Sequence, residues 1–352
     1  MVRATKERTR ATGTPGLVHA WPNQTEASRL LGIEPSTLLR RNLRYEEFGG
    51  REKRFAPRVV LGEALYYKRV PVQEVAAGLF AAARDWLRAR GMTAIRGPVN
   101  PSMNYECGLL IEGFDTPPSM MMGHARPYYA GHVEALGYVK AKDVIAYDYD
   151  ARISPPRAMQ AMVDRAKKSG NLTLRTLSKK NLARDLRIII DIFNDAWSNN
   201  WGFVPMTEAE VAALGKNLKL LVKEHYIAIA EYRGQPAAMA VSLPDINGWI
   251  ADLNGRLMPF GWSKLAWRVF MRPPAAVRIP LMGVKKAFHG TATGSALALA
   301  VIDSIRTSHL ARGTDHAELS WILEDNLPIR RMIESLGAKP YKTYRVYEKA
   351  LA

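Results

Sequence analysis

Residues 277–337 read VRIPLMGVKKAFHGTATGSALALAVIDSIRTSHLARGTDHAELSWILEDNLPIRRMIESLG. The first eight residues, 277–284, are mostly apolar, which is typical of a buried strand. A loop of small residues follows at 289–295, and apolar residues then recur at helical spacing until Gly313. Because glycine commonly ends a helix, the pattern predicts a strand, a small-residue loop and a helix that stops at Gly313.

The rest of the stretch repeats this order in a shorter form. Residues 317–323 form a second apolar run, and a short helical pattern runs from Pro328 to Gly337. Together the two parts predict a βαβα unit. Backbone amides in its loop can hold a phosphate group at the N-terminus of the first helix.

Two motifs in this stretch resemble the GNAT acyltransferases. The acyl-CoA loop of that family has a basic residue or Gln, two residues, Gly, any residue, and Gly or Ala; here residues 289–294 read HGTATG. The second motif, an Asn after the next strand and a helix ending Glu-x-Leu-Gly, is matched by Asn326 and by residues 334–337. The sequence departs from the family at Ala292, which replaces a Gly, and at Ile333, where many members carry a Tyr that protonates the leaving thiolate.

The resemblance implies a GNAT-like mixed α/β sheet with flanking helices and a site for acetyl-CoA or a longer acyl-CoA. The loop amides would bind the pyrophosphate, and pantetheine would lie along residues 282–284. The residues that the resemblance assigns to acyl-CoA are Met282, Gly283, Val284, His289, Gly290, Thr291, Ala292, Thr293, Gly294, Ser295 and Asn326.

The implied reaction is attack of an amine on the acyl-CoA thioester. Amides at 282–284 would polarise the carbonyl, and a carboxylate is needed to deprotonate the amine. Glu318 and Glu231 are the candidates, although either could equally be a surface group on a strand. Two alternatives stay open. One is a βαβ unit with an ordinary Gly-rich turn. The other is a DNA-binding transcriptional regulator whose GNAT-like domain senses a CoA thioester or lipid without turnover.

A second informative stretch is WPNQTEASRLLGIEPSTLLRR, residues 21–41. Ser28, Gly32 and Leu38 have the spacing of a helix-turn-helix, in which a small residue lets the helices cross closely and the glycine makes the turn. The stretch resembles the MerR-like or winged modules of bacterial regulators, and a plain αα-hairpin is the alternative. Expected contacts to double-stranded DNA come from Gln24, Thr25, Ser36, Thr37, Arg40, Arg41, Arg51, Lys53 and Arg54.

Composition places limits on the class of protein. The 352 residues suggest about two domains, and 47% apolar with 24% charged residues is typical of a globular protein. The single cysteine, Cys107, excludes an internal disulfide and favours the reducing cytoplasm. The sequence shows no recognised metal-ligand spacing, no secretory signal and no run of about 18 apolar residues. The net charge of +17 suits nucleic acid, CoA or an anionic membrane surface.

The expected domains follow from these motifs and the composition between them. By analogy with helix-turn-helix DNA-binding proteins, which are often dimers, we expect a homodimer. The expected segments are a disordered basic arm (1–16), a small all-α helix-turn-helix DNA-binding module (17–70), a connecting helix (71–91), a partial GNAT-like repeat (92–150), a linker (151–171) and a complete GNAT-like acyltransferase domain (172–352).

Residues 249–272 interrupt the expected strand order. They read WIADLNGRLMPFGWSKLAWRVFMR, in which bulky apolar residues alternate with arginine and lysine. One interpretation is an acyl-chain lid or a membrane-surface helix. The other is a helix packed on the sheet whose arginines extend to solvent.

Overall fold

The computed structural model describes residues 45–48, 52–55, 72–100, 102–211 and 223–351, and these divide between two compact units. The first unit comprises residues 1–93 with 351–352, and the second comprises residues 94–350. No described helix is both long enough and apolar enough to cross a membrane.

The described part of the first unit is a short hairpin and one helix. Strands β1 (Tyr45–Phe48) and β2 (Glu52–Phe55) pair antiparallel. Helix α6 (Val72–Arg88) is followed by Gly91 at a φ of +73°, a conformation that glycine adopts readily. Lys53 and Arg54 lie on β2, whereas the helix-turn-helix segment and the other expected DNA-contacting residues, Gln24, Thr25, Ser36, Thr37, Arg40, Arg41 and Arg51, lie outside the described residues.

The second unit is built on a mixed nine-stranded sheet, counted over the described residues. The path runs β3-β13-β7-β12-β11-β10-β9-β8, and β6 pairs with β13 beside it. The strands of this sheet are β3 (Ala94–Gly97), β6 (Leu109–Glu112), β7 (Val139–Asp150), β8 (Leu172–Thr176), β9 (Ile227–Tyr232), β10 (Gln235–Pro244), β11 (Ala276–Val284), β12 (His316–Leu323) and β13 (Lys339–Ala350). Strands β4 (Val99–Asn100) and β5 (Glu106–Cys107) form a separate small ladder.

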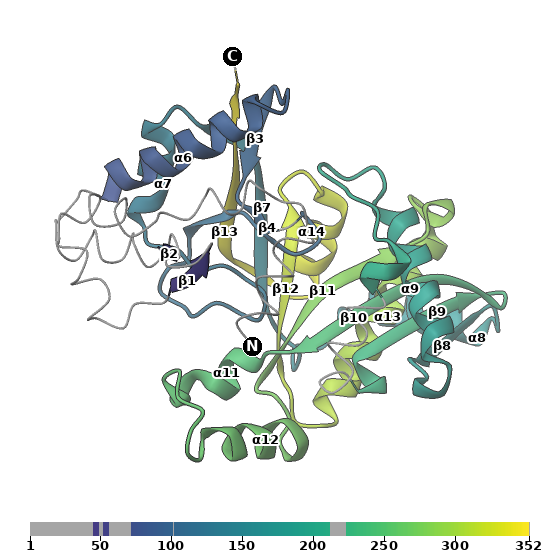
Figure 1. Cartoon of the computed structure of the whole chain (residues 1–352). Coiled ribbons are helices and arrows are strands. Elements are labelled where there is room, and N and C mark those ends of the chain that lie inside the picture. The colour runs from purple at the N-terminus through teal and green to yellow at the C-terminus, as the bar shows by residue number, and fades with distance from the viewer. Residues whose placement is uncertain (1–44, 49–51, 56–71, 101, 212–222, 352) are drawn as a thin grey trace. The chain divides into compact units, whose positions relative to one another are not determined.

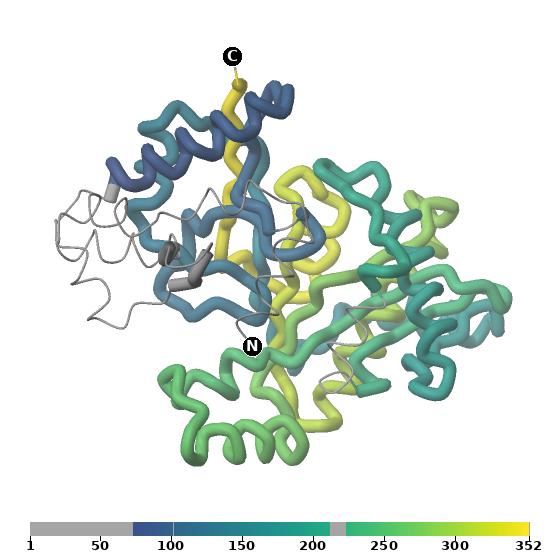
Figure 2. The backbone as a smooth tube through the Cα atoms, viewed as in Figure 1, coloured from purple at the N-terminus to yellow at the C-terminus, as the bar shows by residue number. Residues whose placement is uncertain are grey.

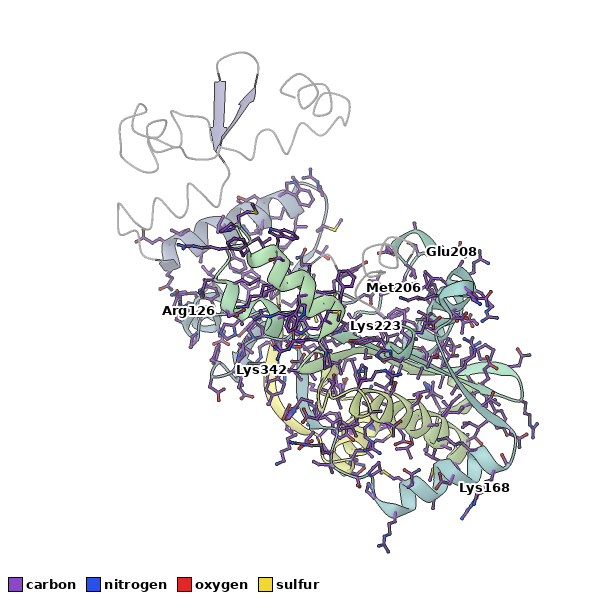
Figure 3. The ribbon with its side chains drawn as sticks, turned by 90° about the horizontal axis from the view of Figure 1, so that it is seen from below. Arg126, Lys168, Met206, Glu208, Lys223 and Lys342 are labelled. Atoms are coloured by element: carbon purple, nitrogen blue, oxygen red, sulfur yellow. The ribbon has the colours of Figure 1, made fainter. Side chains whose placement is uncertain are left out.

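Helices connect and cover these strands. The helices of the second unit are α7 (Tyr128–Ala135), α8 (Arg157–Lys168), α9 (Leu182–Trp197), α11 (Ile246–Ile250), α12 (Gly261–Met271), α13 (Ala292–Leu310) and α14 (Leu327–Ser335), with single 3-10 turns η1 (Lys179–Asn181), η2 (Glu224–Tyr226), η3 (Ala251–Leu253) and η4 (Lys286–Phe288). Helices α9 and α13 cover opposite faces of the sheet (Figures 1 and 3). The expected mixed α/β sheet with flanking helices is confirmed.

Strand β7 joins two distant parts of the chain. It pairs antiparallel with β12 on one edge and with β13 on the other. Figure 2 shows the blue tube of β7 running beside the yellow tube of β13. Residues 94–150 therefore contribute strands to the same sheet as residues 172–350, and α8, in the expected linker, packs on α13.

Local sequence explains the elements nearest to the site. Thr291 caps α13 by accepting a hydrogen bond from the Gly294 amide. The β9–β10 hairpin turns at Arg233 and Gly234, whose φ angles of +51° and +75° are those of a two-residue primed turn.

Candidate active site

The parallel strands β11 and β12 separate partway along their length. They pair from Ala276 opposite His316 to Ile279 opposite Leu319, and the pairing stops at Pro280. Proline has no amide hydrogen to donate to a ladder, which explains why the pairing ends there. Both strands continue past this point, so a gap opens between them.

A cavity of about 660 Å³ fills this gap. Trp197 of α9 and Ala298 of α13 both line it, so it passes between the two faces of the sheet. Its volume is within the range of small-molecule sites. The cavity has three parts: a loop at one mouth, a polar and aromatic wall beside α9, and an apolar arm beneath α13.

Hydrogen bonds within the loop at the mouth of the cavity fix its conformation. Thr291 Oγ1 donates to the Phe288 carbonyl at 2.7 Å and accepts from the Gly294 amide at 3.0 Å. His289 Nε2 donates to the Val284 carbonyl at 2.7 Å. The amides of Gly290, Ala292 and Thr293 donate to no atom of the described residues, which leaves three donors at the N-terminus of α13. Such a helix end favours an anion such as a pyrophosphate.

Two glycines make this loop possible. Gly290 has a φ of +71°, where a side chain would be strained. A Cβ atom at Gly294 would lie 2.1 Å from the Phe288 carbonyl oxygen, so no larger residue fits between the helix and the loop.

The wall beside α9 is polar and aromatic. Trp197 Nε1 donates to the Met282 carbonyl at 2.9 Å, and its ring meets Trp321 edge to face at 5.8 Å. Lys286 Nζ donates to Asn199 Oδ1 at 3.0 Å. This wall therefore places a cation and amide groups beside an indole surface. Such a surface suits a ligand that carries a polar reacting group next to an apolar chain.

The arm beneath α13 is lined mainly by aliphatic side chains. They come from three strands and from the inner face of the helix, and include Ala240, Val277, Ile279, Ala298, Ile302, Ile305, Ala317 and Leu319. At the far end lies His309, 3% exposed. Ser242 Oγ donates to the Tyr226 carbonyl and so accepts from His309 Nε2 at 2.8 Å. Burial lowers the pKa of His309 to about 4, so this histidine is neutral and suits an apolar neighbourhood.

One residue that lines the cavity has a buried hydroxyl with no hydrogen-bond partner among the described residues. The hydroxyl of Tyr149, on β7, makes no hydrogen bond within the described residues although the side chain is buried. Burial raises the pKa of this phenol, so it stays protonated. Because an unpaired buried hydroxyl is costly, it is a candidate donor to a bound ligand.

The two carboxylates expected to act as bases lie elsewhere. Glu318 is buried and accepts hydrogen bonds from Ser320 and Tyr341, with the guanidinium of Arg278 at 3.7 Å. Glu231 pairs with Arg175 across β8 and β9 at 2.8 Å. Neither lines the cavity.

The structure brings most of the expected acyl-CoA residues together. Nine line the cavity: Met282, Gly283, Val284, His289, Gly290, Thr291, Gly294, Ser295 and Asn326. Ala292 and Thr293 lie beside them at the start of α13. Within the described residues, no cluster of three or more His, Cys, Asp or Glu is arranged to hold a metal ion.

Sequence reasoning missed Tyr149 and the apolar arm. Tyr149 reaches the cavity because β7 pairs beside β12, with Tyr149 opposite Ala317. No local pattern encodes that pairing. No local pattern indicates that Trp197 and Trp201 line the cavity.

No protein-family model matches the chain. Among solved structures, a GCN5-related N-acetyltransferase from Sphaerobacter thermophilus aligns at a TM-score of 0.48 with 12% identity, covering 94% of each chain. A tandem GNAT protein from the clavulanic acid biosynthesis pathway aligns at 0.43 with 12% identity, over 81% of this chain and 73% of that chain.

Two curated proteins are much more similar in sequence. Protein YghO of Escherichia coli is 45% identical over 281 residues, which is 79% of this chain and 71% of that protein. The bacterial ceramide synthase of Caulobacter vibrioides is 46% identical over 274 residues, or 78% of this chain and 71% of that protein. The chain therefore belongs to the acyltransferase family that contains these two proteins.

Proposed function

We propose that the protein is an acyl-CoA-dependent N-acyltransferase that joins a long acyl chain to the amine of a lipid-like amino alcohol. The observation that supports the proposal is a cavity that joins the unpaired amides at the start of α13 to an apolar arm. The name of the Caulobacter relative, a ceramide synthase, supports an amide product of this kind.

Each part of the cavity has a role in this proposal. The amides of Gly290, Ala292 and Thr293 bind the pyrophosphate of CoA, with Lys286 adding positive charge. Pantetheine lies along residues 282–284 in the gap between β11 and β12. The acyl chain occupies the arm beneath α13, where transfer from water of each buried methylene contributes about 0.8 kcal/mol.

The reaction requires a proton acceptor and a proton donor. The amine approaches from the wall beside α9 and attacks the thioester carbon. The resulting oxyanion is stabilised by backbone amides of β11, the carbon–sulfur bond breaks, and the amine proton leaves to a base. The Tyr149 hydroxyl is the candidate to protonate the thiolate, since Ile333 stands where the family resemblance implied a tyrosine. Glu318 and Glu231 stay predictions for the base, although neither lines the cavity.

The test is release of free CoA from acyl-CoA by the purified chain. With a long-chain acyl-CoA and a long-chain amino alcohol we expect equal amounts of free thiol and amide. The control lipid is a long-chain alcohol without the amine, which should give neither product. Binding of the thioester without release of CoA would contradict the proposal and favour a sensor.

The DNA-binding module stays a prediction from the sequence. Substituting Arg40 and Arg41 by Ala should weaken binding of a fluorescent DNA duplex and reduce its dependence on salt. Unchanged affinity would remove that hypothesis, and a homodimer, expected only by analogy with such modules, would lose its basis.

A further inference from the structure

Helix α12 and the loop before it present large apolar side chains to solvent. The exposed fractions are 74% for Met258, 77% for Phe260, 57% for Trp262, 52% for Trp267, 63% for Phe270 and 71% for Met271. We call these six residues the apolar patch. No residue of α12 is buried.

The patch lies on one side of the helix. With 3.6 residues per turn, Trp262, Trp267, Phe270 and Met271 fall within about half of the helix circumference. The opposite side carries Arg268, which is 13% exposed and pairs with Asp252 at 2.6 Å. Leu265 and Val269 are half-buried beside Arg268, but the largest apolar side chains of the helix face water, unlike those of a usual surface helix.

Positive charges border the patch. Residues 246–272 contain four cations (Arg256, Lys264, Arg268 and Arg272) and a single acid, Asp252. Lys264 and Arg268 pair with Asp252. Arg256 and Arg272 form no ion pair with the described residues, and Arg272 lies over the ring of Trp267 at 5.3 Å.

A shallow groove joins the charges to the aromatic rings. It lies between η3 and α12, and both Arg256 and Lys264 line it together with Phe260 and Trp267. Arg256 there forms no ion pair with the described residues, whereas Lys264 pairs with Asp252, which also lines the groove.

The patch also lies near the apolar arm of the cavity. Helix α12 ends at Met271, and the Pro274 carbonyl that follows accepts a hydrogen bond from Thr314 Oγ1 at 2.8 Å. Thr314 is among the residues that line the cavity. Figure 1 shows α11 and α12 together beyond the end of β10.

We propose that the segment Ile246–Arg272 docks onto an anionic lipid bilayer, with the apolar patch inserted at the interface and Arg256 and Arg272 against lipid phosphates. Tryptophan and phenylalanine beside arginine and lysine are the composition of interfacial helices. A patch this exposed on a monomer indicates an interaction surface, and the net charge of +17 favours an anionic partner. The docking does not depend on acyl transfer, so the two proposals can fail separately.

The test is flotation of the full chain with vesicles. One set contains phosphatidylcholine alone, and the other contains phosphatidylcholine and phosphatidylglycerol in equal amounts. We expect the wild-type chain to float with the anionic vesicles and to be released by high salt. The double variant Trp262→Ser, Phe270→Ser should bind at least about tenfold more weakly, because two large rings no longer leave water.

Two further variants sharpen the test. Trp86→Ser removes an equally exposed tryptophan, at 54%, outside the segment, and should bind as the wild type does. Arg256→Gln with Arg272→Gln should reduce binding to anionic vesicles and lower its salt dependence. A cooperative thermal unfolding transition at the wild-type temperature shows that each variant is folded.

Three outcomes would overturn the proposal. They are absence of wild-type binding to both vesicle types, equal binding by wild type and the Trp262→Ser, Phe270→Ser variant, and a wild-type oligomer that the same two substitutions convert to monomer. The last would assign the patch to contact with a second copy of the chain.

Discussion

At the scale of single residues, the anion site at the start of α13 can be tested without disturbing the fold. Gly294 is a poor choice because any Cβ there meets the Phe288 carbonyl. Ala292 is exposed, stands in the first helical turn and leaves its amide unpaired. A carboxylate at this position stabilises a helix, while it repels a pyrophosphate.

For Ala292→Asp we therefore expect unchanged or slightly higher stability of the free protein and CoA affinity reduced by about tenfold or more. Calorimetric titration with CoA and thermal unfolding measure the two effects. Ala292→Asn has the same shape without the charge and should bind CoA nearly as the wild type does. Equal affinity in the Asp and Asn variants would show that the phosphates bind elsewhere.

Tyr149 gives the second test at this scale. Its hydroxyl is buried without a partner, so Tyr149→Phe should raise the free energy of unfolding by about 1 kcal/mol. If the hydroxyl protonates the thiolate, turnover in the same variant should fall by at least about tenfold. A variant with full activity would exclude that role, whatever its stability, and urea unfolding with a thiol-release assay measures both quantities.

At the scale of elements, the inner face of α13 should set the length of acyl chain that the cavity accepts. Ala298 lines the arm and is 5% exposed. Ala298→Leu puts three more carbons into that space. We expect stabilisation by a long-chain acyl-CoA to fall well below the roughly 2–3 kcal/mol of a saturating ligand, with acetyl-CoA unaffected.

Ile302→Val serves as the matched control because it widens the same arm. It should retain or improve binding of the long chain, as followed by thermal unfolding with each thioester. An equal loss for acetyl-CoA and long-chain acyl-CoA in Ala298→Leu would contradict an acyl chain beneath α13.

Local pattern predicted the elements around the site well. The helix expected to stop at Gly313 runs to Leu310, and the short helix expected before Gly337 runs to Ser335, because helical spacing and glycine ends are local signals. The gap after Pro280 and the place of β7 depend on pairing between distant segments. That is why the loop residues could be named from sequence, whereas Tyr149 could not.

At the scale of the whole molecule, stability should fall on mild acidification. Burial lowers the pKa of both His225 and His309 to about 4, below the ordinary value of 6.5. In the unfolded chain these two imidazoles bind protons near pH 6.5, whereas in the folded chain they bind protons only near pH 4. The contribution of the neutral histidines to the free energy of unfolding is thus fully present above pH 6.5 and is lost as the pH falls toward 4. This loss is on the order of 3 kcal/mol for a fully buried group.

Urea unfolding between pH 7 and pH 4 measures this loss. His309→Gln can still donate to Ser242 but cannot titrate, so its stability should depend less steeply on pH. The same slope in wild type and variant would show that His309 is not the group responsible.

The position of β7 has a consequence for how the chain is made. Its residues 139–148 pair with residues 339–348, which are synthesised about 200 residues later. At roughly 5–20 residues per second, a ribosome needs about 10 to 40 seconds to cover that interval. For most of that time the twelve-residue strand lacks the partners of both edges, because β12 is also made late, and unpaired edges favour aggregation. Pairing between segments so far apart in the sequence also slows folding, so β7 stays exposed to other chains until the last strand of the sheet has been made.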